Sequence, residues 1–289
     1  GTLAVTESTT GARLTVAANR DGGWATGLAR RVSRHLQEEA ALRVGRVPIA
    51  RPRVLAVVHD PWVGGRRLGR VLGWHPPQAL VGDYVRDVGR ASHGTVRYTV
   101  TEWLDAAWWL PKVDGFRHAG DEYLRRWRER DMHVPDALDQ ALRVRDFDLA
   151  ARWDRDEFDE CWFLAMPYAG DYESTMVGRG AFWCNSPPVE GFQACSGRFV
   201  VMGFNVERDA GCMLENLGHR VESMMQRLWR RRRTDDDPWR MFVRHDLTHP
   251  GRAHCGTVHH APNSRRDYDW GNSRPVWSLC DLWLHSVPS

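Results

Sequence analysis

Four short apolar segments alternate with segments of helical periodicity, and this alternation constrains the fold more than any other feature of the sequence. The apolar segments are RVLAVV at 53–58, TVRYTVTEWL at 95–104, FDECWFLAM at 158–166 and FVVMGFNVE at 199–207. Short runs rich in β-branched and aromatic residues are typical of strands. The apolar spacing predicts helices at 77–92, 135–153 and 210–232. The sequence therefore predicts an α/β fold, with a mostly parallel central sheet and helices on both faces.

The length and composition of the chain are compatible with one large domain. Its 289 residues are 42% hydrophobic, which is enough to form a substantial core. We expect residues 53–232 to form the α/β core, and residues 1–50 to form an N-terminal appendage with a strand at 13–17 and a helix at 24–41. Residues 238–289 are rich in His, Pro, Gly, Asn and Trp, which predicts a long, loop-rich C-terminal region that wraps the single domain 1–289.

The charge and cysteine patterns narrow the classes of protein to consider. The 40 basic and 37 acidic residues are interleaved and leave a formal charge of +3, so we expect no nucleic-acid partner. We also expect no membrane span, because no apolar run approaches the roughly 18–20 residues that a spanning helix needs. The six cysteines contain no CxxC pair, which excludes a zinc finger. Their positions allow one or two disulfides, among Cys184, Cys195, Cys255 and Cys280.

The predicted helix 210–232 carries the most function-like group of residues. At 100° per residue, Glu215, His219 and Glu222 fall within an arc of about 60° and can converge on one point. Gly218 lies beside this stripe, so another segment could approach it closely. A His and a Glu three residues apart can supply two ligands of a zinc site, with Glu215 orienting the imidazole or acting as general base. The alternative is an ion pair on a solvated helix face.

A second segment, HDLTHPGRAHCGTVHH at 245–260, places five histidines in 16 residues. Neutral imidazole is a common transition-metal ligand, and an open catalytic site needs three protein ligands and a water. We expect His259 to be the third ligand, with His254 as the next choice. The alternative is a set of surface histidines.

Carboxylates around the third apolar segment form another candidate site. Asp159, Glu160, Asp171 and Glu173 could act as the acid and base of a glycoside hydrolase, or could simply be solvated. Tryptophan is unusually frequent, with 15 copies against 9 Phe and 6 Tyr, and core packing is favoured over sugar stacking as the reason. The segment DYDWGN at 267–272 is interpreted as a turn. Candidate substrate-binding residues are Trp183, Asn185, Arg208, Asn263, Asp267 and Trp270.

Several long motifs resemble those of a family of bacterial α/β proteins of unassigned function, many of which are secreted. The motifs include FDECWFLAMPYAGDYES, FNVERDAGCMLENLGHRVES and VHHAPNSRRDYDWGN, and the resemblance runs from about residue 53 to the C-terminus. It implies an extracellular or cell-envelope setting. The alternative is a cytoplasmic location, if no leader was removed. The family pattern implies an aromatic residue at His260 and an Asn at Asp60, and the first departure favours His259 as the functional position.

Together these features predict a metal-dependent hydrolase that acts on a peptide or a glycan. Zinc would be held by His219, Glu222 and His259, with Glu215 or Glu173 as general base. A metal-free glycoside hydrolase and a non-catalytic carbohydrate- or cell-wall-binding module are the alternatives. The oligomeric state is left open.

Overall fold

A computed structural model describes residues 3–8, 11–16, 23–43, 46–229 and 237–284, which form two compact units. The first unit comprises Gly1–Val44 and Pro48–Asn216, and the second comprises Gly45–Val47 and Leu217–Ser289. The organisation as one domain stays a prediction.

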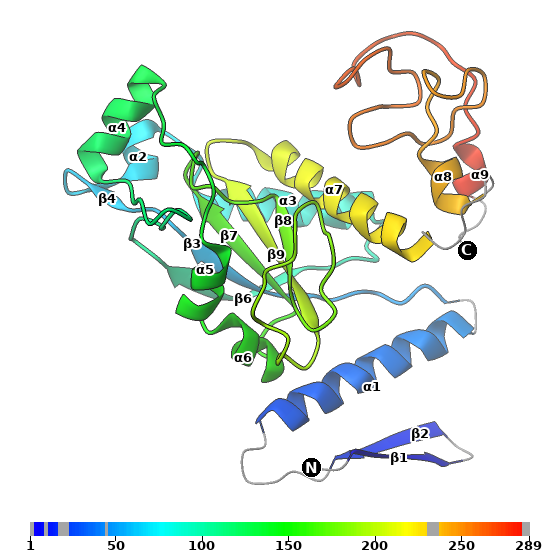
Figure 1. Cartoon of the computed structure of the whole chain (residues 1–289). Helices are drawn as coiled ribbons and strands as arrows, with labels where there is room; N and C mark the ends of the chain where they lie inside the picture. Colours follow the sequence, from blue (N-terminus) through cyan, green and yellow to red (C-terminus); the bar gives the residue numbers. More distant parts are fainter. Residues whose placement is uncertain (1–2, 9–10, 17–22, 44–45, 230–236, 285–289) are drawn as a thin grey trace. The chain divides into compact units, whose positions relative to one another are not determined.

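The first unit contains the predicted α/β sheet, which has five strands in the order β6-β3-β7-β9-β8 (Figure 1). The strands β3, β6, β7 and β9 are parallel to one another, whereas β8 runs antiparallel to β9. They span Arg53–Val58 (β3), Thr99–Asp105 (β6), Glu160–Ala165 (β7), Ser174–Gly178 (β8) and Arg198–Asn205 (β9). The α/β prediction is therefore confirmed, and β8 is a strand that the sequence pattern did not reveal.

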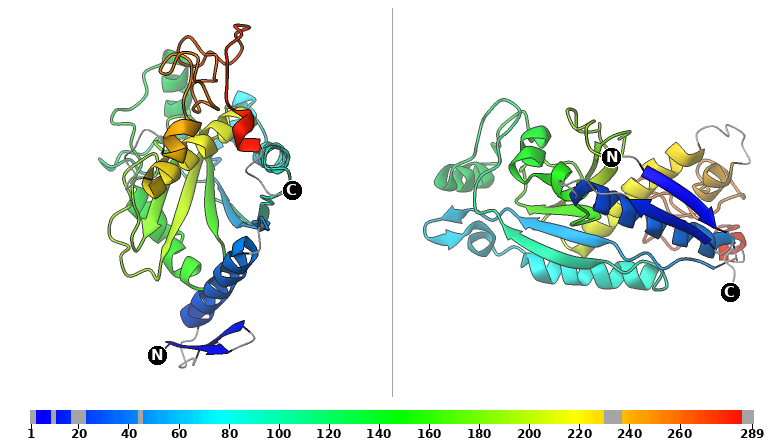
Figure 2. Two further views of the ribbon diagram at one scale, coloured as in Figure 1. Left: turned by 90° about the vertical axis from the view of Figure 1, so that its right-hand side faces the viewer. Right: turned by 90° about the horizontal axis from the view of Figure 1, so that it is seen from below.

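Both faces of the sheet are buried, because successive side chains of each strand point to opposite sides. On one side Leu55, Phe163 and Val201 pack beneath α5 (Gln140–Asp146) and α6 (Leu149–Asp154). On the other side, the ring of Trp162 lies 5.2 Å from that of Tyr84 on α3 (Pro77–Ala91). Figure 2 shows these helices on opposite sides of the sheet.

The prediction of one continuous helix at 135–153 was wrong. It is divided into α5 and α6 at Asp148, whose φ of 49° is left-handed and cannot continue an α-helix. Residues 135–139 precede α5, which begins where the Asp139 carboxylate accepts a hydrogen bond from the Leu142 amide at 2.8 Å. A local polar cap and a left-handed residue thus overrode the apolar periodicity.

The remaining elements are short, with the exception of two helices. The first unit also contains β1 (Leu3–Ser8), β2 (Gly11–Val16), α1 (Gly23–Arg43), β4 (Trp62–Val63), β5 (Arg66–Arg67), α2 (Leu68–Leu72) and α4 (Gly120–Glu129). The long helix α7 (Ala210–Trp229) continues into the second unit, which contains α8 (Pro238–Phe242) and α9 (Asp281–Leu284). Residues 243–280 contain no helix or strand, as expected for a loop-rich region. Residues 17 and 230–232, at the ends of a predicted strand and a predicted helix, lie outside the described residues.

The structure bears on the expected absence of a membrane span and on the disulfides that the sequence allowed. Every described helix is too short or too polar to cross a bilayer. All six cysteines are free thiols, so the structure contains neither of the disulfides that the sequence allowed.

A buried histidine just after β3, His59, should make the stability of the fold depend on pH. His59 is 1% exposed, and its ring stacks on Phe163 at 5.7 Å with Trp108 and Phe147 at its edges. Burial, assisted by the charge of Arg143, lowers its pKa from 6.5 to about 3. Below pH 6.5, His59 therefore binds a proton in the unfolded chain but stays neutral in the folded chain. The free energy of unfolding falls as the pH decreases from 6.5 towards 3.

Replacing His59 with Phe, which fits the aromatic surroundings, removes the contribution of His59 to the pH dependence of stability. Between pH 7 and pH 5, the unfolding free energy of the original protein should fall by about 2 kcal/mol more than that of His59→Phe. Urea unfolding at the two pH values measures the difference. Equal losses would show that His59 is not the titrating group.

Candidate metal centre

Helix α7 supplies the first residues of the site. Asp209 caps the start of this helix, because its carboxylate accepts hydrogen bonds from the amides of Gly211 at 2.9 Å and Cys212 at 3.4 Å. Glu215 and His219 lie one turn apart on the same face of this continuous helix. The boundary between the two units falls inside the helix, after Asn216.

A glycine allows the histidine-rich loop to approach this helix. A Cβ at Gly218 would lie 2.5 Å from the Cγ2 atom of Val258, well inside van der Waals contact. The residue after Val258 is His259, so the absence of a side chain at Gly218 permits the ring of His259 to reach the helix. The close approach expected at Gly218 is confirmed.

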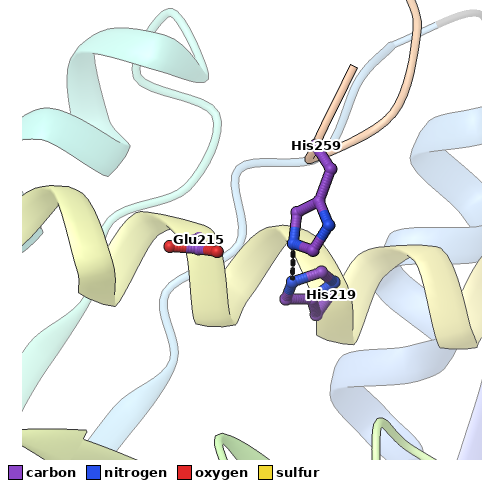
Figure 3. Close-up of side chains that lie close together, drawn as sticks. All are labelled: Glu215, His219 and His259. Carbon is purple, nitrogen blue, oxygen red and sulfur yellow. Dashed lines mark hydrogen bonds between the residues drawn. The ribbon is translucent and has the colours of Figure 1, made fainter. Parts of the chain in front are cut away.

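The two imidazoles meet through the same type of nitrogen. His219 Nε2 and His259 Nε2 lie 3.0 Å apart (Figure 3). Two nitrogens bound tetrahedrally to one zinc ion at about 2.0–2.1 Å would lie about 3.4 Å apart, so the observed spacing is close to that of a ligand pair. Ligand atoms of Glu215, His219 and His259 all lie within 4.8 Å of one another.

Each imidazole has a carboxylate on its outer nitrogen. The Nδ1 atom of His219 lies 3.4 Å from the Glu222 carboxylate, and the Nδ1 atom of His259 lies 3.1 Å from that of Asp267. Metal-binding histidines commonly make this outer contact, which fixes the ring and its tautomer. Glu222 is itself fixed, because its Oε1 atom accepts a hydrogen bond from the Val258 amide at 2.9 Å.

The two outer contacts favour the tautomer in which the Nε2 lone pair of each ring points toward the other ring. An imidazole whose Nδ1–H donates to a carboxylate has a lone pair on Nε2. With both rings in that tautomer, the two facing Nε2 atoms repel each other unless a cation lies between them. The geometry of the pair therefore suits a metal ion.

Tyr268 is a residue of this site that the sequence did not single out. Its hydroxyl lies 2.8 Å from His259 Nε2, the atom that also faces His219. The backbone of Tyr268 is left-handed, with a φ of 56°, which is uncommon for an aromatic residue and often marks a functional position. Tyr268 lies in the turn that the DYDWGN motif predicted, and its place next to Asp267 was the only available signal.

Neighbouring residues of the motif hold the loop together. The indole of Trp270 donates to the Val258 carbonyl at 2.9 Å, and Asn263 donates to the carbonyls of Asn272 and Arg274 at 3.2 and 3.0 Å. These contacts stabilise the loop that carries His259. The predicted substrate-binding roles of Trp270 and Asn263 remain predictions, and Asp267 has a partner within the site.

The other histidines of the loop lie in different surroundings. His245 and His260 stack with ring centroids 4.5 Å apart, while His254 accepts a hydrogen bond from the Trp283 indole at 3.1 Å. Burial lowers the pKa of His245, and the neighbouring His260 and His249 lower it further. The structure thus brings His259, rather than His254, to His219.

Glu173, Asn185 and Arg208 belong to the first unit. Glu173 and Arg208 line a pocket of about 230 Å³ beyond the carboxyl ends of β7 and β9, and the Asn185 amide donates to Glu173. Trp183, two residues before Asn185, is 61% exposed.

The four carboxylates of the predicted glycosidase site are divided between the two ends of β7. Asp159 forms ion pairs with Arg53 and Arg34 before the strand begins, whereas Asp171 and Glu173 follow its carboxyl end. Both lie beside Gly203, which is in register with Phe163, so four strand residues at about 3.3 Å each separate them from Asp159 by roughly 13 Å along the strand. A catalytic pair needs a separation of about 5–9.5 Å, so Asp159 cannot act together with Asp171 or Glu173.

The fold identifies the chain as an α/β protein with a mostly parallel sheet. Comparisons with known protein families, with curated proteins and with solved structures found no match.

Proposed function

We propose that the chain is a zinc-dependent hydrolase whose metal is held by His219, His259 and Glu215. The pair of facing Nε2 atoms, each on a ring whose other nitrogen contacts a carboxylate, is the observation that carries the proposal. Two histidines and a glutamate with one position left for water are a known ligand set of catalytic zinc.

The two glutamates of the helix take different roles from those expected from the sequence. Glu222 contacts both His219 Nδ1 and the Val258 amide, which suits a positioning residue better than a ligand. Glu215 has its carboxylate within reach of the two Nε2 atoms. We therefore assign Glu215 to the metal and Glu222 to the orientation of His219.

When bound, zinc would supply a water of lowered pKa and polarise the bond to be cleaved. The Tyr268 hydroxyl lies next to one of the proposed ligand atoms. It contacts His259 Nε2, and binding of a metal at that nitrogen would release its hydrogen bond. Tyr268 could then donate to the substrate oxygen on which negative charge develops.

The proposed substrate is a peptide or a glycan, as the sequence analysis predicted. The proposed extracellular or cell-envelope setting is supported by the resemblance to the often secreted bacterial family.

Metal content tests the proposal directly. Protein purified without a metal-affinity column and dialysed against zinc should contain one zinc ion per chain by mass spectrometry. Hydrolysis of a panel of peptides and oligosaccharides should stop after EDTA treatment and return with one equivalent of zinc. Metal far below one equivalent after dialysis would contradict the proposal, as would hydrolysis that EDTA leaves unchanged.

A further inference from the structure

The pocket in the first unit lies where an open α/β sheet commonly binds ligands, outside the carboxyl ends of parallel strands. The adjacent strands β7 and β9 end at Ala165 and Asn205 (Figure 1), and the segments that follow them form its walls. Its volume is about 230 Å³. Its lining includes Asp136, Tyr168, Asp171, Glu173, Arg208 and Asn216.

The charges of this pocket are nearly balanced. Asp136 is paired with the buried Lys112, and Asp171 with the buried Arg143. Arg208 offsets the remaining carboxylate, Glu173. Carboxylates accept hydrogen bonds and repel anions, so the lining favours an uncharged ligand with many donors over a phosphate or an acidic group.

An aromatic ring lies at the same pocket. Tyr168 is 47% exposed, and its left-handed backbone, with a φ of 56°, is held by a hydrogen bond from Lys112 Nζ to its carbonyl at 2.5 Å. A sugar ring presents C–H groups on its face and hydroxyls at its edge. Tyr168 lines the pocket together with carboxylates, and its ring meets that of Trp127 edge to face at 6.2 Å, so the lining offers an aromatic group and hydrogen-bond acceptors for both parts of such a ligand.

The neighbouring sheet edge is closed to a peptide. β8 is the outer strand on this side, and the segment 184–189 covers it. The Val189 amide donates to the Met176 carbonyl at 2.9 Å, and the Ser186 hydroxyl donates to the Ser174 carbonyl at 2.8 Å. An extended peptide therefore cannot add to β8 as a further strand, which is a common mode of peptide binding.

The pocket adjoins the residue that we assign to zinc. Cys212 and Asn216 of α7 line the pocket, and Glu215 lies between them on the same helix. Burial raises the pKa of the Cys212 thiol; Arg208 lowers it, whereas the nearby carboxylates of Glu215 and Glu173 raise it.

We infer that this pocket binds one sugar unit of an uncharged oligosaccharide, with Tyr168 against the ring face and Glu173 and Arg208 at its hydroxyls. The conclusion that a glycan is the substrate, and not only a ligand, rests on the proposed zinc hydrolase.

Calorimetric titration of the full chain, stripped of metal with EDTA, tests the binding alone. The probes are tetrasaccharides of β-1,4-linked glucose, xylose and N-acetylglucosamine, with tetra-alanine as the peptide. At least one tetrasaccharide should bind, and Tyr168→Ala and Glu173→Gln should each weaken it by about 10-fold. Tyr172→Ala is the matched control, because Tyr172 is also an exposed tyrosine but does not line the pocket.

The outcomes separate this inference from the proposed function. It is overturned if no tetrasaccharide binds, if only tetra-alanine binds, or if binding is unchanged in both pocket variants. Stoichiometric zinc without sugar binding would leave the metal centre standing and remove the sugar site. Sugar binding that is sensitive to both variants, in a protein that takes up no zinc, would support the sugar site and contradict the metal centre.

Discussion

Replacing His259 or His219 with alanine is expected to weaken zinc binding by about 1000-fold, and hydrolysis should disappear with it. Structural zinc sites bind with about 10–16 kcal/mol, so one ligand of four contributes roughly 2.5–4 kcal/mol, and the upper value corresponds to about 1000-fold. Each variant also breaks the contact between the two Nε2 atoms. Competition with a chromogenic zinc chelator measures the affinity of each variant.

Matched variants show whether the loss belongs to this pair of rings. His249→Ala removes an exposed histidine of the same loop, whose ring contacts Thr248, and should bind zinc as the original protein does. Glu222→Gln should weaken binding by only 10–100-fold, as expected for a group behind a ligand. Unchanged affinity in both His219→Ala and His259→Ala would remove these residues from any zinc site.

Helix periodicity could place Glu215, His219 and Glu222 on one face, but it could not assign their roles. The two glutamates differ by only about 20° around the helix axis, so each can reach a shared point. What separates them is the Val258 amide, which binds Glu222 and belongs to a segment 36 residues away. Such a contact depends on how the loop folds, and no local pattern encodes it.

The strands were predictable where burial on both faces produced continuous apolar runs. β7 and β9 are buried along almost their whole length, and both were identified. β8 was missed because STMVG is short and follows the polar segment GDYE, although every residue in the strand is buried. Its antiparallel pairing with β9 also lies outside the β-α-β pattern on which the prediction rested.

Asp171→Ala is expected to lower the free energy of unfolding by about 3–5 kcal/mol, because it leaves a buried guanidinium without its carboxylate. Arg143 is 2% exposed, and its guanidinium lies 3.8 Å from the centroid of the Phe163 ring. Asp171 pairs with it, and the side-chain Oε1 atom of Gln140 accepts a hydrogen bond from it at 2.6 Å. Urea unfolding measures the loss.

The double variant Arg143→Met, Asp171→Ala removes both charges and should recover much of that stability, since an apolar replacement of a buried ion pair is often neutral. Asp105→Ala breaks the ion pair of a 62% exposed carboxylate with Arg67 and should cost less than about 1 kcal/mol. If the double variant is as unstable as Asp171→Ala, the unpaired charge is not the cause of the loss. Recovery would instead identify Asp171 as the group that neutralises Arg143 beneath the pocket, which leaves Glu173 as the carboxylate available to a ligand there.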